Sequence, residues 1–259
     1  MKSRRRVNSD VGPQNMTIDQ QQGLIAILDA LGAANYSQEK IGRFLQSREL
    51  VLEQLRWKAA RVQEIDPTLL TTFTFNDTVL ILYQTKAPVT MQDVRGFGEL
   101  LRRFAVKSLE HGILFRGSLS IGPFYVDSAT NTVLGDAVTD AASWYNVADW
   151  IGILATPQAT LFIQSLLEQN SGDIERLLVD YDVPLKNQEP RRLKAVNWPK
   201  AFFVKGMTPC ADGEKPRSKC LALLTEHGVP KGTESKYFNT LAFFDHCVKL
   251  YNQSKKKKR

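Results

Sequence analysis

Two aspartates are the residues best placed to do chemistry. Asp29 ends the apolar run GLIAILDA at residues 23–30, and Asp77 follows Asn76 between two β-rich runs. An isolated carboxylate at the end of an apolar strand is costly to desolvate unless it is paired, ligated or at a wet edge. If the two carboxylates converge they repel each other, and a bound divalent cation removes that repulsion. The pair therefore predicts a site for two divalent ions, either Mg²⁺ or Mn²⁺. Substrate phosphates would supply the remaining ligands of these ions.

Such a site supports phosphoryl chemistry, because two divalent ions can activate an attacking oxygen and neutralise a leaving one. The sequence contains no nucleophile elbow, P-loop lysine motif or HExxH zinc motif. The carboxylate pair is thus the single catalytic candidate. For Asp77 taken alone, a role in turning the chain is the alternative, since Asp is common in turns.

The order of the predicted elements explains how the two acids meet. A continuous apolar run predicts a buried strand at 23–30, and helical spacing of apolar residues predicts helices. The predicted elements are strand 23–30, helix 37–63, two strands within 68–83 joined at Asn76-Asp77, helix 91–111 and strand 113–122. This βαββαβ order is typical of the ferredoxin-like fold, an α+β antiparallel sheet with helices on one face. There the first strand ends beside the tip of the central hairpin, so Asp29 and Asp77 are expected to converge.

The rest of the chain predicts smaller elements and three regions. We expect a hairpin at 128–134, a helix starting at Gly135-Asp136, a strand at 150–156, a helix at 157–169, a last strand at 197–205 and a short helix near 238–251. The predicted regions are a disordered basic tail at 1–18, a main domain at 19–205, and a loop-rich C-terminal appendage with a basic tail at 206–259.

Composition favours a globular protein of the cytoplasm. Of the 259 residues, 43% are hydrophobic and 24% are charged, which is enough to bury a core. No apolar run approaches the roughly 18 to 20 residues of a membrane span, and the N-terminus lacks the apolar core of a signal peptide. The three cysteines form no CxxC pair, which argues against a disulfide scaffold. A metal site built from the scattered cysteines and histidines between Cys210 and Cys247 would match no known ligand spacing.

The net charge of +7 raises nucleic-acid binding as an alternative. Nine basic residues lie at the two ends of the chain, and without them 34 basic residues become 25 against 27 acidic ones. The body is therefore close to neutral, and nucleic acid is not an expected partner. This alternative predicts salt-sensitive binding that is lost when the tails are deleted.

Four motifs lie within roughly residues 20 to 160: LIAILDALGAAN with Asp29, FNDTVLILY with Asp77, RGSLSIGP from Arg116, and LGDAVTDAAS. In their order and spacing this part of the sequence resembles the catalytic domains of class III adenylate and guanylate cyclases. The resemblance implies a palm-like catalytic domain over 19–205, with the metal ions held by Asp29, Asp77 and the backbone carbonyl of Ala30. It implies that Ala33 and Ala34, in the turn after the first strand, bind the triphosphate. It also implies a homodimer with shared active sites, and attack of the ribose 3′ hydroxyl on the α-phosphate.

Departures from this pattern bear on the substrate. Purine cyclases commonly place Lys or Glu where this chain has Phe73, and a polar base reader where it has Thr132; their transition-state Asn and Arg align with Thr139 and Ser143. These substitutions resemble the pyrimidine cyclases of bacterial Pycsar anti-phage systems. That resemblance implies conversion of UTP, or CTP, to a 3′,5′-cyclic nucleotide that activates a downstream effector.

The individual residues leave alternatives open. Phe73 either stacks on a base or packs in the core, and Arg116 either binds the substrate or forms a structural salt bridge. For the whole chain, the alternatives are an adenylate or guanylate cyclase with an altered pocket, and a catalytically silent module that only binds a nucleotide.

Overall fold

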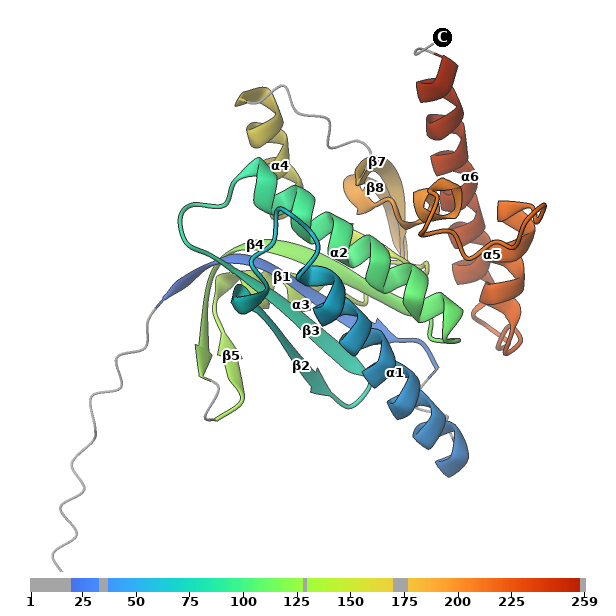
Figure 1. Ribbon diagram of the computed structural model, residues 1–259, viewed down its shortest axis with the longest axis horizontal. Helices are drawn as coiled ribbons and strands as arrows, with labels where there is room; N and C mark the ends of the chain where they lie inside the picture. The colour runs from blue at the N-terminus through green and yellow to red at the C-terminus, as the bar shows by residue number, and fades with distance from the viewer. Residues whose placement is uncertain (1–19, 33–36, 128–129, 170–176, 257–259) are drawn as a thin grey trace, which may run out of the picture.

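The computed structural model describes residues 20–32, 37–127, 130–169 and 177–256, so Ala33, Ala34 and the predicted tail at 1–18 lie outside the described residues. A mostly antiparallel sheet forms its centre, in the order β2-β3-β1-β4-β6-β8-β7, with β5 paired to β4 (Figure 1). The strands are β1 Gln21–Ala30, β2 Leu70–Phe75, β3 Thr78–Thr85, β4 Phe115–Asp127, β5 Thr132–Leu134, β6 Ile153–Ala155, β7 Leu178–Leu185 and β8 Gln188–Val196. The helices are α1 Gln38–Ala59, α2 Met91–Glu110, α3 Asp136–Trp144, α4 Pro157–Gln169, α5 Pro216–Thr225 and α6 Glu234–Lys256, with 3-10 turns η2 Pro67–Leu69 and η3 Trp198–Phe203.

The first six major elements confirm the predicted βαββαβ arrangement. Strand β1 lies between β3 and β4 and is antiparallel to both, and β2 pairs with the outer edge of β3. This is the ferredoxin-like strand order. The central position of β1 explains its uninterrupted apolar sequence, because residues 24–28 are all buried between layers on both faces.

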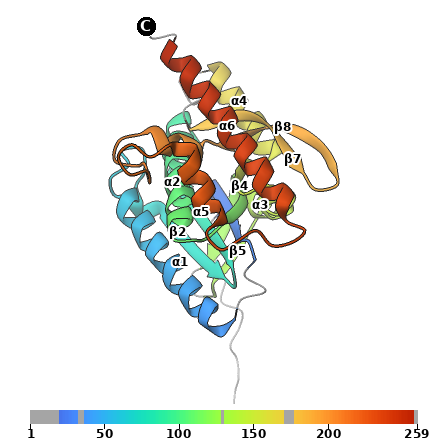
Figure 2. The same cartoon turned by 90° about the vertical axis from the view of Figure 1, so that its right-hand side faces the viewer.

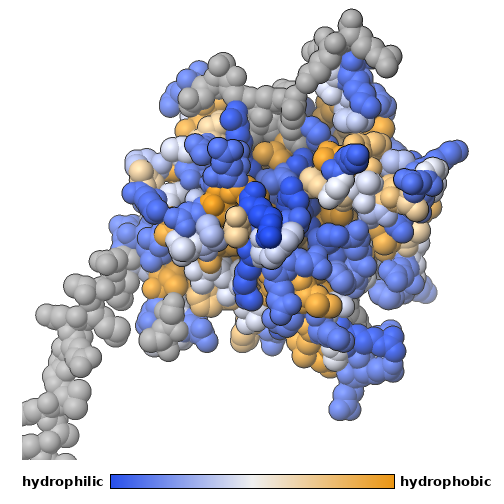
Figure 3. Space-filling model, in the orientation of Figure 1, coloured by the Kyte–Doolittle hydropathy of each residue, from blue (hydrophilic) through white to orange (hydrophobic). Residues whose placement is uncertain are grey.

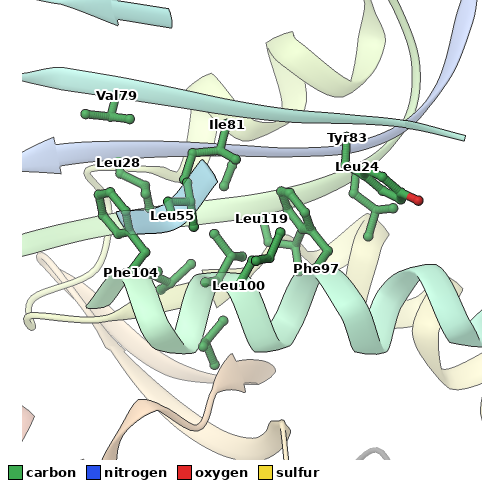
Figure 4. Close-up of a cluster of buried hydrophobic side chains, with 14 of the residues drawn as sticks. Leu24, Leu28, Leu55, Val79, Ile81, Tyr83, Phe97, Leu100, Phe104 and Leu119 are labelled. Carbon is green, nitrogen blue, oxygen red and sulfur yellow. The ribbon is translucent and has the colours of Figure 1, made fainter. Parts of the chain in front are cut away.

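Helices cover both faces of this half of the sheet. Leu24, Leu28 and their neighbours on one face pack against Leu55 of α1 and Phe104 of α2 (Figure 4). On the opposite face, Ile25 and Ile27 pack with Ala137 and Ala141 of α3. Figure 2 shows α1 and α3 on opposite sides of the sheet. As predicted, α1 and α2, the two helices of the βαββαβ unit, cover the same face of the sheet. Helix α3 covers the opposite face.

Beyond β4 the sheet continues through β6, which is parallel to β4, and then through β8 and β7. The prediction of a strand at 197–205 is wrong, because residues 198–203 form the 3-10 turn η3. Asn197 caps this turn by accepting a hydrogen bond from the Lys200 amide at 3.2 Å, and Pro199 occupies its first turn. The strands of this region are β7 and β8. They were not predicted, because their sequences contain charged residues and proline.

The C-terminal helices pack on this second half of the sheet. Phe243 and Phe244 of α6 are fully buried in a cluster with Trp150, Trp198 and Val183, and the short helix predicted near 238–251 extends over the whole of α6. Helix α5 lies within the segment expected to be loop-rich. Among the described residues, no helix is both long and apolar enough to cross a bilayer.

Asp140 fastens α3 to the sheet. Its carboxylate accepts hydrogen bonds from Ser120 Oγ on β4 at 2.6 Å and from Thr156 Oγ1 at 2.5 Å, and both hydroxyl-bearing residues are fully buried. Asp140→Ala would leave these buried hydroxyls without their acceptor, so we expect the free energy of unfolding to fall by about 1–3 kcal/mol. Urea denaturation measures this change. Asp136→Ala, on the same helix but exposed, is the control and should change stability by less than about 1 kcal/mol; equal effects of the two substitutions would contradict the anchoring role.

Candidate active site

One row of side chains crosses the sheet at the end of β1. Asp29 pairs with Thr78 of β3 on one side and with Arg116 of β4 on the other, and Thr78 in turn pairs with Phe75 of β2. Directly opposed residues of antiparallel strands point to the same face, so these four side chains share the face that carries α3. The row combines an acid, a cation, a hydroxyl and an exposed aromatic ring.

The structure brings Asp77 to the end of β1, as the predicted topology requires. The Ala30 amide donates a hydrogen bond to the Asp77 carbonyl at 3.1 Å, which ties the strand end to the tip of the β2–β3 hairpin. Asn76 provides the positive φ of +53° that this tight turn needs, a conformation that Asn tolerates. From α1, Arg48 Nη1 donates to the Asn76 carbonyl at 2.9 Å and holds the tip in place.

Arg116 forms an ion pair with Asp29. Its Nε and Nη2 donate to Asp29 Oδ2 at 3.2 and 3.0 Å, and both side chains are only 13–16% exposed. Burial raises the pKa of Asp29, the hydrogen bonds and charge of Arg116 oppose this rise, and the nearby charge of Asp77 adds to it. Both hydrogen bonds from Arg116 go to Oδ2 of Asp29. The other carboxylate oxygen, Oδ1, accepts no hydrogen bond from the described residues.

Lys186 is a further cation at this site that the sequence pattern did not reveal. It follows β7, and its amide donates to the Val147 carbonyl at 2.9 Å. Burial lowers the pKa of Lys186, as do the charges of Arg116 and Lys236, while Asp149 and Asp29 raise it. Lys186 is therefore near enough to Asp29 and Arg116 for their charges to shift its pKa. No sequence motif pointed to it, because the β7–β8 hairpin itself was not predicted.

The donors at the site fit a hard divalent cation that also binds phosphate. The described residues contain no cluster of three or more His, Cys, Asp or Glu side chains able to enclose a metal ion. Mg²⁺ and Mn²⁺ do not require such an enclosure, since one or two carboxylates together with phosphate oxygens suffice. Asp29 Oδ1, Asp77 and the carbonyl of Ala30 are the oxygens available where the strand end meets the hairpin.

The two predicted base-reading residues, Phe73 and Thr132, lie at different distances from Asp29 along the sheet. Phe73 pairs with Leu80 in the row next to Asp29 and is half-buried against the Ile25–Ile27 cluster, so it lies on the same face as the acid. Thr132 pairs with Asp127 at the opposite end of β4 from Arg116, so within one chain it is not brought to Asp29. Its hydroxyl accepts a hydrogen bond from Thr130 Oγ1 at 2.8 Å. Thr139 and Ser143 are exposed neighbours on α3, joined by a hydrogen bond from Ser143 Oγ to the Thr139 carbonyl.

Comparison with known proteins gives matches among solved structures only. No protein-family model and no curated protein matches the sequence. The catalytic core of a rhodopsin-guanylyl cyclase with converted specificity, solved with ATPalphaS, is 14% identical with a TM-score of 0.46, and the match covers 70% of this chain and 97% of that one. An adenylate/guanylate cyclase/hydrolase from Silicibacter pomeroyi is 18% identical with a TM-score of 0.42, covering 69% and 95%. Both TM-scores are below 0.5.

Proposed function

We propose that the protein is a metal-dependent nucleotide cyclase that converts UTP, or CTP, to the 3′,5′-cyclic nucleotide and pyrophosphate. The observation that carries the proposal is the meeting of Asp29 and Asp77 at the end of the central strand of a ferredoxin-like sheet, with Arg116 and Lys186 beside them. Paired acids bordered by cations suit a ligand that carries both metal ions and phosphates. The sequence resemblance to class III cyclases selects cyclisation from among the reactions such a site supports.

In this proposal each side chain has a distinct task. Asp29, Asp77 and the Ala30 carbonyl would hold the two divalent cations. When bound, these ions would lower the pKa of the ribose 3′ hydroxyl and neutralise the leaving pyrophosphate. Arg116 keeps the Asp29 carboxylate oriented through Oδ2, and its remaining donor group can meet a phosphate oxygen. The partner subunit of a homodimer would complete the base pocket, since Thr132 is remote from Asp29 in its own chain.

Lys186→Ala tests the cationic side of the site. The ammonium group has no ion pair among the described residues, and we assign it to the triphosphate. Its removal is expected to raise the KM for the nucleotide about tenfold, which corresponds to the loss of one charge-assisted contact. Steady-state kinetics at saturating Mn²⁺ measure this change. Lys231→Ala removes an exposed lysine and should leave KM unchanged; the same KM in all three proteins would refute the assignment.

The preference for a pyrimidine rests on Phe73 and on the absence of the usual purine-reading residues. Phe73 presents part of its ring on the face of Asp29, where it can stack on a small base. Incubation of the purified protein with each of the four nucleoside triphosphates and Mn²⁺, followed by mass identification of the cyclic product, tests this preference. Cyclic UMP or cyclic CMP as the main product is the expected result. Conversion of ATP or GTP alone would overturn the pyrimidine preference and leave the purine cyclase alternative.

The cellular role belongs to the same proposal. Sequence resemblance to Pycsar cyclases supports a cyclic pyrimidine nucleotide that acts as a messenger in anti-phage defence through a downstream effector. Cells that express the protein with and without phage challenge provide the test, by measurement of the cyclic nucleotide in extracts. A rise on infection is expected, and a level that does not respond to any phage would contradict the defence role.

A further inference from the structure

A cavity of about 270 Å³ lies between α1 and α2. These helices cover the face of the sheet opposite to the face that carries α3 and Asp29. Its apolar wall consists of Val51 and Leu55 from α1 together with Phe104 and Val106 from α2. Gly206 and Met207, which follow η3, border it on a further side. Figure 3 shows this side of the molecule, where hydrophilic residues are interrupted by small apolar areas.

Cations gather at this cavity. Lys58, Arg103 and Lys107 line it, and Arg61 lies close by, 3.3 Å from the centre of the Trp57 ring. Two of the cations have acidic partners within α2, since Arg103 pairs with Glu99 at 2.6 Å and Lys107 with Glu110 at 2.5 Å.

Lys58 differs from the other two cations that line the cavity, Arg103 and Lys107, because it forms no ion pair with any described residue. Its ammonium group lies 4.4 Å from the centre of the Trp57 ring, a cation-π contact. Burial lowers the pKa of Lys58, and the charges of Arg103, Arg61 and Lys107 lower it further. A half-buried cation repelled by three others, with no carboxylate to compensate, favours the arrival of an anion.

The combination of an apolar wall and an uncompensated cation specifies the ligand. We propose that this cavity binds a small amphipathic anion, a molecule with an aromatic or acyl body and one carboxylate, sulfonate or phosphate group. The apolar body would lie against Leu55 and Phe104, and the anionic group would contact Lys58. A volume of about 270 Å³ is near the lower end of ligand cavities, which suits a molecule of about two rings. Trp57, which is 51% exposed, stands at the cavity and offers a further apolar surface.

A polyanion such as nucleic acid fits these observations less well. Its recognition needs a row of exposed cations along a groove, whereas Arg103 and Lys107 are already paired with acids. The cavity is also separate from the candidate active site. Leu55 and Phe104 belong to the same buried cluster as Leu28, the residue before Asp29, so the core lies between the two sites (Figure 4).

The test uses two fluorescent probes of almost the same shape. 8-Anilinonaphthalene-1-sulfonate carries an anionic group, and N-phenyl-1-naphthylamine is its uncharged counterpart. Lys58→Met keeps most of the side-chain volume and removes the charge, so it should raise the Kd of the anionic probe about tenfold and change that of the neutral probe by less than about twofold. Lys40→Met makes the same change at an exposed position in the first turn of α1 and should affect neither Kd.

A cavity-filling variant supports the location. Gln54 lines the cavity and is half-buried, so Gln54→Trp should place a ring in it and weaken both probes at least about tenfold. Circular dichroism establishes whether each variant is folded. If one of Lys58→Met and Gln54→Trp does not fold, the other variant tests the proposal. The proposal is overturned if the folded wild-type protein binds neither probe, if Lys58→Met leaves the Kd of the anionic probe unchanged, or if it weakens both probes equally.

Discussion

Replacement of Asp77 by asparagine is expected to lower nucleotide turnover at least about a thousandfold, or about 4 kcal/mol in activation free energy. The substitution keeps the size of the side chain and its position at the hairpin tip, and removes the negative charge. Because Asp77 lies at a turn whose fold depends on Asn76 and on the backbone bond to Ala30, we expect stability to remain unchanged. Pyrophosphate release at saturating Mn²⁺ measures turnover, and thermal denaturation measures stability.

Asp29→Asn should produce the same loss of turnover together with a loss of stability. Asp29 is the partner of Arg116, and an asparagine cannot compensate a guanidinium group that is only 13% exposed. We expect the free energy of unfolding to fall by about 1–3 kcal/mol. Asp182→Asn, which breaks an exposed ion pair with Arg192 on the β7–β8 hairpin, is the matched control and should leave both quantities near wild type. Normal turnover in either the Asp29 or the Asp77 variant would exclude the carboxylate pair from catalysis.

Phe243→Ala is expected to destabilise the whole protein by about 3–5 kcal/mol. The ring is fully buried and contacts Trp150 and Tyr181, with ring centres 4.7 and 4.9 Å away, so truncation leaves a cavity among large aromatic side chains. Because these partners come from before residue 206, the loss should appear as a shift of a single unfolding transition. Guanidinium denaturation followed by tryptophan fluorescence and by circular dichroism measures it.

The control for this variant lies on the same helix. Phe238 is 70% exposed, and Phe238→Ala should change stability by less than about 0.5 kcal/mol. The sequence-based prediction that 206–259 is an appendage leads to a different outcome. If the segment folds separately, Phe243→Ala would create an early second transition and leave the main one in place.

The convergence of Asp29 and Asp77 was predictable because it depends on topology alone. A buried apolar strand, a hairpin signalled by Asn76-Asp77 and two amphipathic helices determine the order of elements, and that order brings the strand end to the hairpin tip. The ion pair between Arg116 and Asp29 was harder to predict. It requires the register between β1 and β4, and a slip of one residue would place Arg116 on the other face.

The second half of the sheet was mostly missed for a physical reason. Strand β8 begins with five exposed residues that include Pro190 and two arginines, so its apolar signal is confined to its last residues. In η3, the apolar run AFFV outweighed the helix-start signal of Asn197 followed by Pro199. Lys186 could not be assigned to the site because the hairpin that carries it was not predicted.

Binding of Mn²⁺ in the presence of a nucleotide that cannot be cyclised tests the central claim most directly, since it needs no turnover. Electron paramagnetic resonance of free Mn²⁺, with a 3′-deoxy analogue of UTP, counts the ions bound to wild type and to the Asp77→Asn variant. We predict two nucleotide-dependent Mn²⁺ ions per chain in the wild-type protein and the loss of at least one in the variant. Equal binding of Mn²⁺ by the two proteins would contradict the assignment of Asp29 and Asp77 as a metal site.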